Sequence, residues 1–141
     1  MIKRLPEKLF NKIYSLVPRL ALDIIIKNKD GIVLAKRDIP KCKGMWHIPG
    51  GTLMLGESID KNVKRIAKYE TGLNVEIFRL IGVKEYTKKS SFFKTISIVY
   101  LTNPISGNLK GNNDGKNVKF FKKIPKNFIK EQKDIFLNVL K

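Results

Sequence analysis

The feature that most constrains the fold is the segment 50–75, GGTLMLGESIDKNVKRIAKYETGLNV. Two adjacent glycines open it, and a run with helical apolar spacing follows Ser58 (Ile59, Val63, Ile66 and Ala67). Serine is a favoured N-cap and glycine a favoured residue just past a helix end, so the pattern predicts a helix from Ser58 to residue 69 or 70, closed at Gly72. A glycine loop leading into a helix N-terminus presents backbone N–H groups and a positive dipole end to phosphate.

The flanking sequence predicts strands with a helix at each end. We expect an N-terminal helix over 6–17, a buried strand over 20–26, a turn at 28–31 and a return strand over 32–37. Further strands are expected at 74–85, 95–101 and 118–121, and a last helix from Pro125 to the C-terminus. This order of elements predicts an α/β fold in a single domain, residues 1–141.

Composition narrows the classes of function without selecting one. The net charge is +17, and the excess lysine is scattered along the chain. A basic surface attracts phosphorylated small molecules, nucleic acids and anionic membranes alike. No apolar run approaches the ~20 residues of a membrane span, and the first residues do not resemble a signal peptide, so we expect a cytoplasmic protein without a membrane partner. The single cysteine, Cys42, excludes an internal disulfide.

The segment 50–75 resembles the Nudix box, G-x5-E-x7-R-E-U-x-E-E-x-G-U, where U is aliphatic. Seven residues occupy their expected places: Gly51, Glu57, Arg65, Ala67, Glu70, Gly72 and Leu73. Two box glutamates are replaced, by Ile66 and Tyr69. The motif WHIPGG at 46–51 and the late VKFFKKIP extend the resemblance over nearly the whole chain. It implies an α/β/α sandwich with a central mixed sheet, an N-terminal helix, the helix of the box and a C-terminal helix.

Within this superfamily the chain looks most like the GDP-mannose mannosyl hydrolase branch, where the same two glutamates are replaced. The likeness implies hydrolysis of a nucleoside diphosphate sugar with Mg2+, or alternatively Mn2+, by attack of water at the anomeric carbon, in a homodimer. It makes Glu70 the side-chain metal ligand and the backbone of Gly50 and Gly51 the adjacent metal and phosphate contact. Because the helix keeps one inward carboxylate, we expect a single ion rather than several.

The resemblance also suggests roles for residues outside the metal site. Arg37 and Arg65 are candidates for binding the diphosphate, and Asp23 for binding sugar hydroxyls. Lys94 aligns nearest to the loop histidine that serves the branch as general base, and it completes the catalytic candidates with Arg65 and Glu70. Two readings stay open from the residues alone. Asp23 could instead pair with Arg37, and Arg65 with Glu57, two turns away on the same helix.

Two other functions remain as alternatives. One is an ordinary diphosphate-cleaving enzyme acting on another nucleoside diphosphate derivative. The other is a module that binds nucleotide or RNA and has lost catalysis. Aromatic and basic residues between the strands expected at 74–85 and 95–101 resemble a stacking platform for single-stranded nucleic acid (Tyr86, Lys88, Lys89, Phe92 and Phe93).

Overall fold

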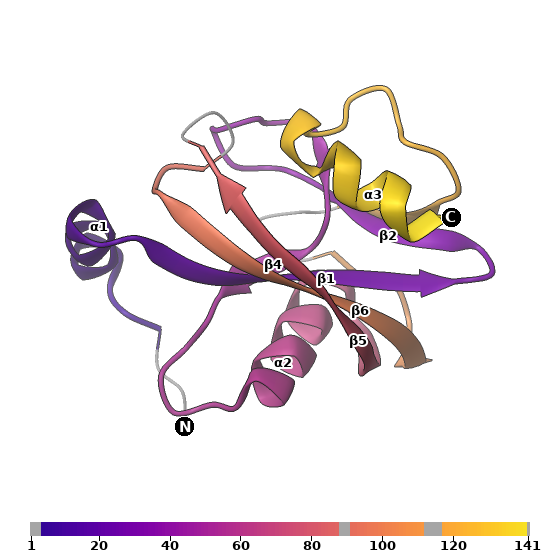
Figure 1. Cartoon of the computed structure of the whole chain (residues 1–141), viewed down its shortest axis with the longest axis horizontal. Coiled ribbons are helices and arrows are strands. Elements are labelled where there is room, and N and C mark those ends of the chain that lie inside the picture. The colour runs from indigo at the N-terminus through magenta and orange to yellow at the C-terminus, as the bar shows by residue number, and fades with distance from the viewer. Residues whose placement is uncertain (1–3, 88–90, 112–116, 141) are drawn as a thin grey trace.

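A mixed β-sheet lies between helices in this computed structural model, which describes residues 4–87, 91–111 and 117–140 (Figure 1). The elements are α1 (Glu7–Leu16), β1 (Arg19–Asn28), β2 (Gly31–Lys36), β3 (Trp46–His47), β4 (Gly50–Thr52), α2 (Ile59–Thr71), β5 (Leu73–Tyr86), β6 (Thr95–Gly107), β7 (Val118–Phe121), the 3-10 turn η1 (Lys130–Gln132) and α3 (Lys133–Leu140). The predicted fold class is confirmed. The two short strands β3 and β4, on either side of Pro49, were not predicted.

The sheet brings the glycine pair beside an acidic residue. Its strand order is β3-β2-β1-β6-β5, with β4 paired to β1 and β7 to β2. The β1–β6 pair is parallel and the other pairs are antiparallel. Strand β1 changes partner along its length: residues near its start pair with β4, whereas Lys27 and Asn28 pair with β2. The first pairing sets Asp23 directly opposite Gly50.

Helix α2 confirms the predicted caps. The Ser58 hydroxyl accepts a hydrogen bond from the Lys61 N–H at 3.2 Å, and Gly72 takes the left-handed conformation with φ 79°. The helix reaches Thr71, slightly farther than predicted. One face of α2 packs against alternate residues of β1, in a buried cluster that includes Val63, Ile66, Ala67, Leu22, Ile24 and Ile26. Burying a large aliphatic side chain contributes about 1.5–3 kcal/mol, so this face anchors the helix.

The C-terminal helix covers the opposite face of the sheet but begins later than predicted (Figure 1). Residues from Pro125 to the start of η1 are a loop, and Phe128 lies in it rather than on the helix. The reason is backbone pairing with β3: Trp46 N–H donates to Asn127 O at 2.6 Å, and Ile129 N–H donates to Trp46 O at 3.1 Å. These bonds use groups that a continuous helix would need. Phe128 still joins the core, with its ring 5.6 Å from that of Phe136.

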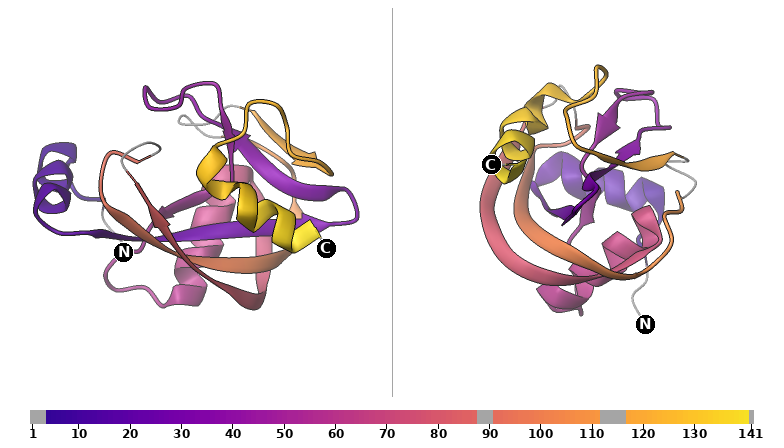
Figure 2. Two further views of the ribbon diagram at one scale, coloured as in Figure 1. Left: turned by 45° about the horizontal axis from the view of Figure 1, so that its top comes forward. Right: turned by 90° about the vertical axis from the view of Figure 1, so that its right-hand side faces the viewer.

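Strands β5 and β6 form a long curved ribbon (Figure 2). β6 was predicted to end at residue 101, but pairing with β5 extends it to Gly107, which lies opposite Leu73. Three register shifts interrupt the pairing, and bulges of this kind bend a strand.

Helix α1 stands at one end of the sheet and buries none of its residues fully. It contacts the body through aromatic side chains: the rings of Phe10 and Tyr14 on α1 lie 5.8 Å and 6.0 Å from that of Phe93. Within the described ranges, no helix combines the length and apolar character that a membrane span requires.

Candidate functional site

A cavity of about 400 Å³ opens where β1, β4, α2 and the end of β5 come together. Five of the seven predicted site residues line it: Asp23, Arg37, Gly50, Gly51 and Glu70. The remaining two, Arg65 and Lys94, are not among its lining residues. The volume falls within the range of small-molecule sites. The fold therefore gathers residues from four separate segments of the chain around one space.

Close packing requires glycine at position 50 and leaves little room for a side chain at position 51. A Cβ atom on Gly50 would lie 2.7 Å from Asp23 Oδ1 and 2.7 Å from the carbonyl oxygen of Leu22, closer than real Cβ contacts. A Cβ on Gly51 would press on Ile66, 3.3 Å from its Cγ1. Glycine at position 50 thus makes room for the Asp23 carboxylate, which faces the cavity floor beside the backbone of the loop.

A chain of hydrogen bonds holds the buried Asp23 carboxylate. The Tyr86 hydroxyl donates to Asp23 Oδ2 at 2.5 Å, and Gln132 Nε2 donates to the Tyr86 oxygen at 2.9 Å. Gln132 is itself oriented by the Ile48 N–H, which donates to its Oε1 at 2.7 Å. The other carboxylate oxygen of Asp23, Oδ1, faces Gly50. The sequence left open whether Asp23 pairs with Arg37. In the structure Tyr86 donates a hydrogen bond to Asp23, and Arg37 acts on the Asp23 carboxylate through its charge.

Burial shifts the pKa of both partners in this bond. Desolvation raises the pKa of Asp23 to about 6, against the opposing effects of the bond from Tyr86, the nearby Ser97 and the charges of Arg19 and Arg37. Desolvation also raises the pKa of the Tyr86 hydroxyl, which stays neutral and donates. The Ser97 hydroxyl is fully buried on the cavity wall, and none of the described residues makes a hydrogen bond of ordinary geometry with it. It lies near enough to Asp23 to favour the carboxylate.

Two arginines bring positive charge into the cavity, and only one of them was predicted. Arg37 Nη1 donates to the carbonyl oxygen of Lys41 at 3.3 Å. Arg19 lines the cavity from the start of β1. Desolvation lowers the pKa of both guanidinium groups, and Asp23 partly offsets the shift in each. The sequence did hold a signal for Arg19: strand side chains alternate, so Arg19 shares a face of β1 with Asp23.

Glu70 and the glycine backbone fit an oxygen-ligated cation. Glu70 is half-buried in the last turn of α2, lines the cavity and acts through its charge on Arg37. Carboxylate and carbonyl oxygens are the ligands that Mg2+ takes, usually few from protein and the rest from water and phosphate. In the part of the chain that the structure describes, no three His, Cys, Asp or Glu side chains gather as metal ligands. Glu70 with the Gly50 and Gly51 carbonyls would hold such an ion.

The two replaced box positions are occupied by side chains with other contacts. Ile66 is 2 % exposed and packs beneath Gly51, within the core under α2. Tyr69 lies on the outer side of the helix, 39 % exposed, with the Arg4 guanidinium 4.4 Å from its ring centre. Neither position offers a carboxylate, and Ile66 contributes apolar burial where the box has a ligand.

Arg65 is engaged in a structural network. Its Nε donates to Glu57 Oε1 at 2.7 Å, and its Nη2 donates to Asn62 Oδ1 at 2.8 Å and to the Thr52 carbonyl at 3.4 Å. Asn62 Oδ1 also accepts from the Met54 N–H at 3.0 Å. The Glu57–Arg65 pair therefore fastens the loop that follows the glycines to α2, and its effect on the cavity passes through that loop.

Lys94, the predicted general base, lies outside the cavity, whereas His47 lines it. The Lys94 ammonium is about half exposed and pairs with Glu85, away from the lining residues. His47 lines the cavity, and its Nδ1 lies 2.9 Å from the Ile48 carbonyl oxygen. Desolvation, then the charge of Arg37, lowers the pKa of His47 to about 4. The ring is neutral at pH 7.

The aromatic residues proposed as a stacking platform separate in the structure. Tyr86 is 6 % exposed, and its hydroxyl bonds to Asp23, so its ring is not a surface platform. Phe93 packs on α1, while Phe92 is 55 % exposed at the cavity rim, with the Lys41 ammonium 5.3 Å from its ring centre. Lys88 and Lys89, predicted in the same set, lie outside the described residues.

The chain matches the family model described as NUDIX domain over residues 17–133. This match covers more than half of the sequence and includes the glycine pair, α2 and every residue named above as lining the cavity. Helix α1 lies outside the matched range. The chain belongs to the NUDIX family. The part of the earlier resemblance that concerns the family is confirmed, whereas the mannosyl hydrolase branch stays a prediction.

Relatives of the chain carry different names. An ADP-ribose pyrophosphatase of Methanocaldococcus jannaschii is 36 % identical over 104 residues, 74 % of this chain and 62 % of that protein. The low-salt glycan biosynthesis protein Agl8 of Haloferax volcanii is 30 % identical over 83 residues, 59 % of this chain and 53 % of that protein. The chain thus spans less than two thirds of the length of either relative.

A solved structure confirms the fold independently. A MutT NUDIX hydrolase from Burkholderia pseudomallei superimposes with a TM-score of 0.73 at 23 % identity, covering 89 % of this chain and 99 % of the other. At this level of identity the likeness concerns the arrangement of elements.

Proposed function

We propose that the NUDIX protein described here hydrolyses a nucleoside diphosphate joined to a sugar, with Mg2+ or Mn2+ as cofactor. One observation carries the proposal: a single cavity joins the glycine pair and Glu70 to two arginines and a buried carboxylate. The glycine pair and Glu70 suit a metal-bound diphosphate. The arginines suit the negative charge of the diphosphate, and the buried carboxylate suits a group that carries hydroxyls. ADP-ribose and GDP-mannose both have this chemistry, and a relative named ADP-ribose pyrophosphatase supports the class.

Residues in different parts of the cavity have different proposed roles. A bound divalent ion would supply Lewis-acid stabilisation of the diphosphate as it leaves or is attacked. Glu70 and the glycine carbonyls would hold that ion, and Arg37 would offer N–H donors to the phosphate oxygens. The Ile48–Gln132–Tyr86 chain keeps the Asp23 carboxylate fixed before substrate enters. Preorganised polar groups of this kind favour the transition state because they need no reorientation during reaction.

For a sugar joined to the diphosphate through its anomeric carbon, as in GDP-mannose, we further propose water attack at that carbon with the nucleoside diphosphate as leaving group. Asp23, in place of Lys94, is then the group that orients the sugar hydroxyl or the water. Lys94 bonds to Glu85 outside the cavity, whereas Asp23 Oδ1 faces the glycine loop inside it. A carboxylate within the cavity can accept a hydrogen bond from either partner. The alternative, attack at phosphorus, uses the same metal and arginines and differs in the products.

Product analysis tests both levels of this proposal. We expect turnover in a panel of ADP-ribose, GDP-mannose, other nucleotide sugars and nucleoside triphosphates with Mg2+ or Mn2+. Free sugar plus nucleoside diphosphate is the product pair expected of attack at carbon. Sugar phosphate plus nucleoside monophosphate marks attack at phosphorus and would overturn the carbon assignment while leaving the hydrolase intact. If no panel member is hydrolysed while RNA binds tightly with a steep salt dependence, the binding-module alternative takes its place.

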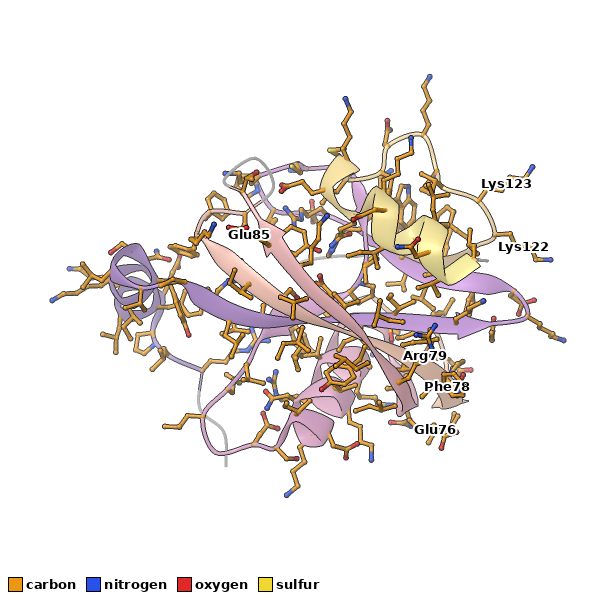
Figure 3. All side chains as sticks on the ribbon, viewed as in Figure 1. Glu76, Phe78, Arg79, Glu85, Lys122 and Lys123 are labelled. Carbon is orange, nitrogen blue, oxygen red and sulfur yellow. The ribbon has the colours of Figure 1, made fainter. Side chains whose placement is uncertain are left out.

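We also predict a homodimer joined through the free edge of β5. Among the described strands β5 pairs with β6 alone, and its outer residues Phe78, Leu80 and Val83 are 63 %, 55 % and 69 % exposed. Charges of both signs, including Glu76 and Arg79, flank this row (Figure 3), so antiparallel pairing of two copies can set opposite charges together. Sedimentation should show a dimer at micromolar concentration and physiological salt, and Phe78→Glu should shift it to monomer. A wild-type monomer under these conditions would contradict the prediction.

A further inference from the structure

Arg19 is held in the cavity by neutral groups. Its Nη1 donates to the Thr52 hydroxyl at 2.9 Å, and its Nε donates to the Thr95 hydroxyl at 3.2 Å. Thr95 in turn donates to the carbonyl oxygen of Phe93 at 3.1 Å. The guanidinium plane is therefore fixed along one edge by two threonines on two different strands.

The opposite edge of the guanidinium has donors to spare. An arginine side chain carries five N–H donors, and the two described contacts use Nε and Nη1. Within residues 4–87, 91–111 and 117–140, Nη2 has no hydrogen-bond acceptor and Arg19 forms no salt bridge. Because the side chain lines the cavity, these unused donors are available to a ligand there.

The charge of Arg19 is only partly compensated by its surroundings. Its pKa is lowered by desolvation and by the positive charge of Arg37, and it is raised by Asp23. Two desolvated guanidinium groups thus share one cavity with two carboxylates, Asp23 and Glu70. A partly desolvated cation without an ion pair gains from an entering anion, since charge-assisted hydrogen bonds are about twice as strong as neutral ones.

Arg19 lies between the glycine loop and the aromatic rim of the cavity. Thr52 follows the glycine pair directly, and β1–β4 pairing sets it opposite Ala21. On the other side, the Arg19 N–H donates to the Lys94 carbonyl at 2.7 Å, next to Phe93. Phe93 and Phe10, in contact with each other, form the apolar rim of the cavity on this side. Arg19 therefore lies between the glycine loop and an aromatic wall suited to a planar base.

We propose that Arg19, oriented by Thr52 and Thr95, binds the phosphate on the nucleoside side of the substrate, with the base against the Phe10–Phe93 wall. This inference rests on the proposed function for the identity of the ligand. The anion site itself depends only on the geometry of Arg19.

Equilibrium binding tests the inference without requiring turnover. Inorganic pyrophosphate and ADP, each with Mg2+, are titrated into the intact protein by calorimetry. We expect Arg19→Gln to raise the Kd of both probes at least tenfold, and Arg19→Lys to raise it less, because an ammonium keeps the charge but not the planar fork. Thr52→Val should raise Kd about threefold by releasing the guanidinium while leaving its charge.

Arg79→Gln is the matched control. It removes the same charge from β5, at the end of the sheet away from α1 (Figure 3), so nonspecific attraction to the +17 chain affects both variants equally. Its Kd should equal that of the wild type. Thermal unfolding verifies that each variant is folded; if Arg19→Gln is not, the Lys and Thr52→Val variants decide.

The outcomes separate the two proposals. Pyrophosphate binding that weakens in Arg19→Gln but not in Arg79→Gln supports the anion site even if no substrate is hydrolysed. A folded Arg19→Gln protein with wild-type Kd overturns the site even if the wild type is an active hydrolase. Failure of the wild type to bind pyrophosphate with Mg2+ also overturns it.

Discussion

Replacing Glu70 with glutamine is expected to lower kcat/KM by about 1000-fold, a loss of about 4 kcal/mol of transition-state stabilisation. Glu70 is the one box carboxylate on α2 that lines the cavity, since Ile66 is buried in the core and Tyr69 faces outward. Removing it leaves the glycine carbonyls without an adjacent anionic ligand on the helix. Steady-state kinetics on the substrate found in the panel measures the loss.

A second readout and a matched control make the Glu70 prediction specific. Binding of Mn2+, followed by electron paramagnetic resonance, should weaken at least tenfold in Glu70→Gln. Glu76→Gln removes an exposed carboxylate from β5 and should change neither activity nor Mn2+ affinity (Figure 3). Full turnover and unchanged Mn2+ binding in Glu70→Gln would show that the metal assignment is wrong.

Replacing Asp23 with asparagine is expected to lower kcat at least 100-fold and, in the metal-free protein, to raise stability above pH 6. The activity falls because an amide cannot accept a proton and orients water or a hydroxyl less strongly than a carboxylate. The Tyr86 hydroxyl can still donate to the amide oxygen, so the bond at 2.5 Å has a substitute. The fold should therefore survive the change.

The stability effect has a definite pH range. The pKa of Asp23 is raised by burial from 3.8 to about 6, so between these values the folded chain keeps a proton that the unfolded chain has released. The free energy of unfolding therefore falls as pH rises from about 4 to about 6, by at most about 3 kcal/mol. Below pH 4 both states are protonated, and this contribution to the pH dependence is absent.

Denaturant unfolding at a series of pH values measures this effect. The difference in unfolding free energy between Asp23→Asn and the wild type should grow in favour of the variant from pH 4 to pH 6 and then level off. A difference that does not change with pH would show that folding does not raise the pKa of the Asp23 carboxyl. Unchanged kcat in a folded Asp23→Asn protein would remove Asp23 from the proposed reaction.

Local patterns in the sequence determined the elements that depend on neighbouring residues. The Ser58 cap, the apolar face of α2 and the left-handed Gly72 all follow from interactions within a few turns, and all were predicted. The same holds for β1, a nearly continuous apolar run. The last helix was misplaced because the residues after Pro125 bond to Trp46, a contact that the spacing of apolar residues does not reveal.

For the candidate site, residue order in the box was enough to select the glycine pair and Glu70, because their spacing along the loop and helix is local. Asp23 and Arg37 were also selected, and the structure brings both into the same cavity. Lys94 was selected by alignment alone, and its partner Glu85 could be known only from the pairing of β5 with β6.

The tertiary structure alone decided what these residues face. The requirement for glycine at position 50 arises from Asp23 on another strand, and the support of Asp23 arises from Tyr86 and Gln132, distant in sequence. Arg19 enters the cavity because β4 and β6 each bring a threonine to it. Strand pairing determines these contacts, and the sequence of a single strand does not specify its partner or its register. The charges and hydrogen bonds that meet in the cavity could therefore be known only from the tertiary structure.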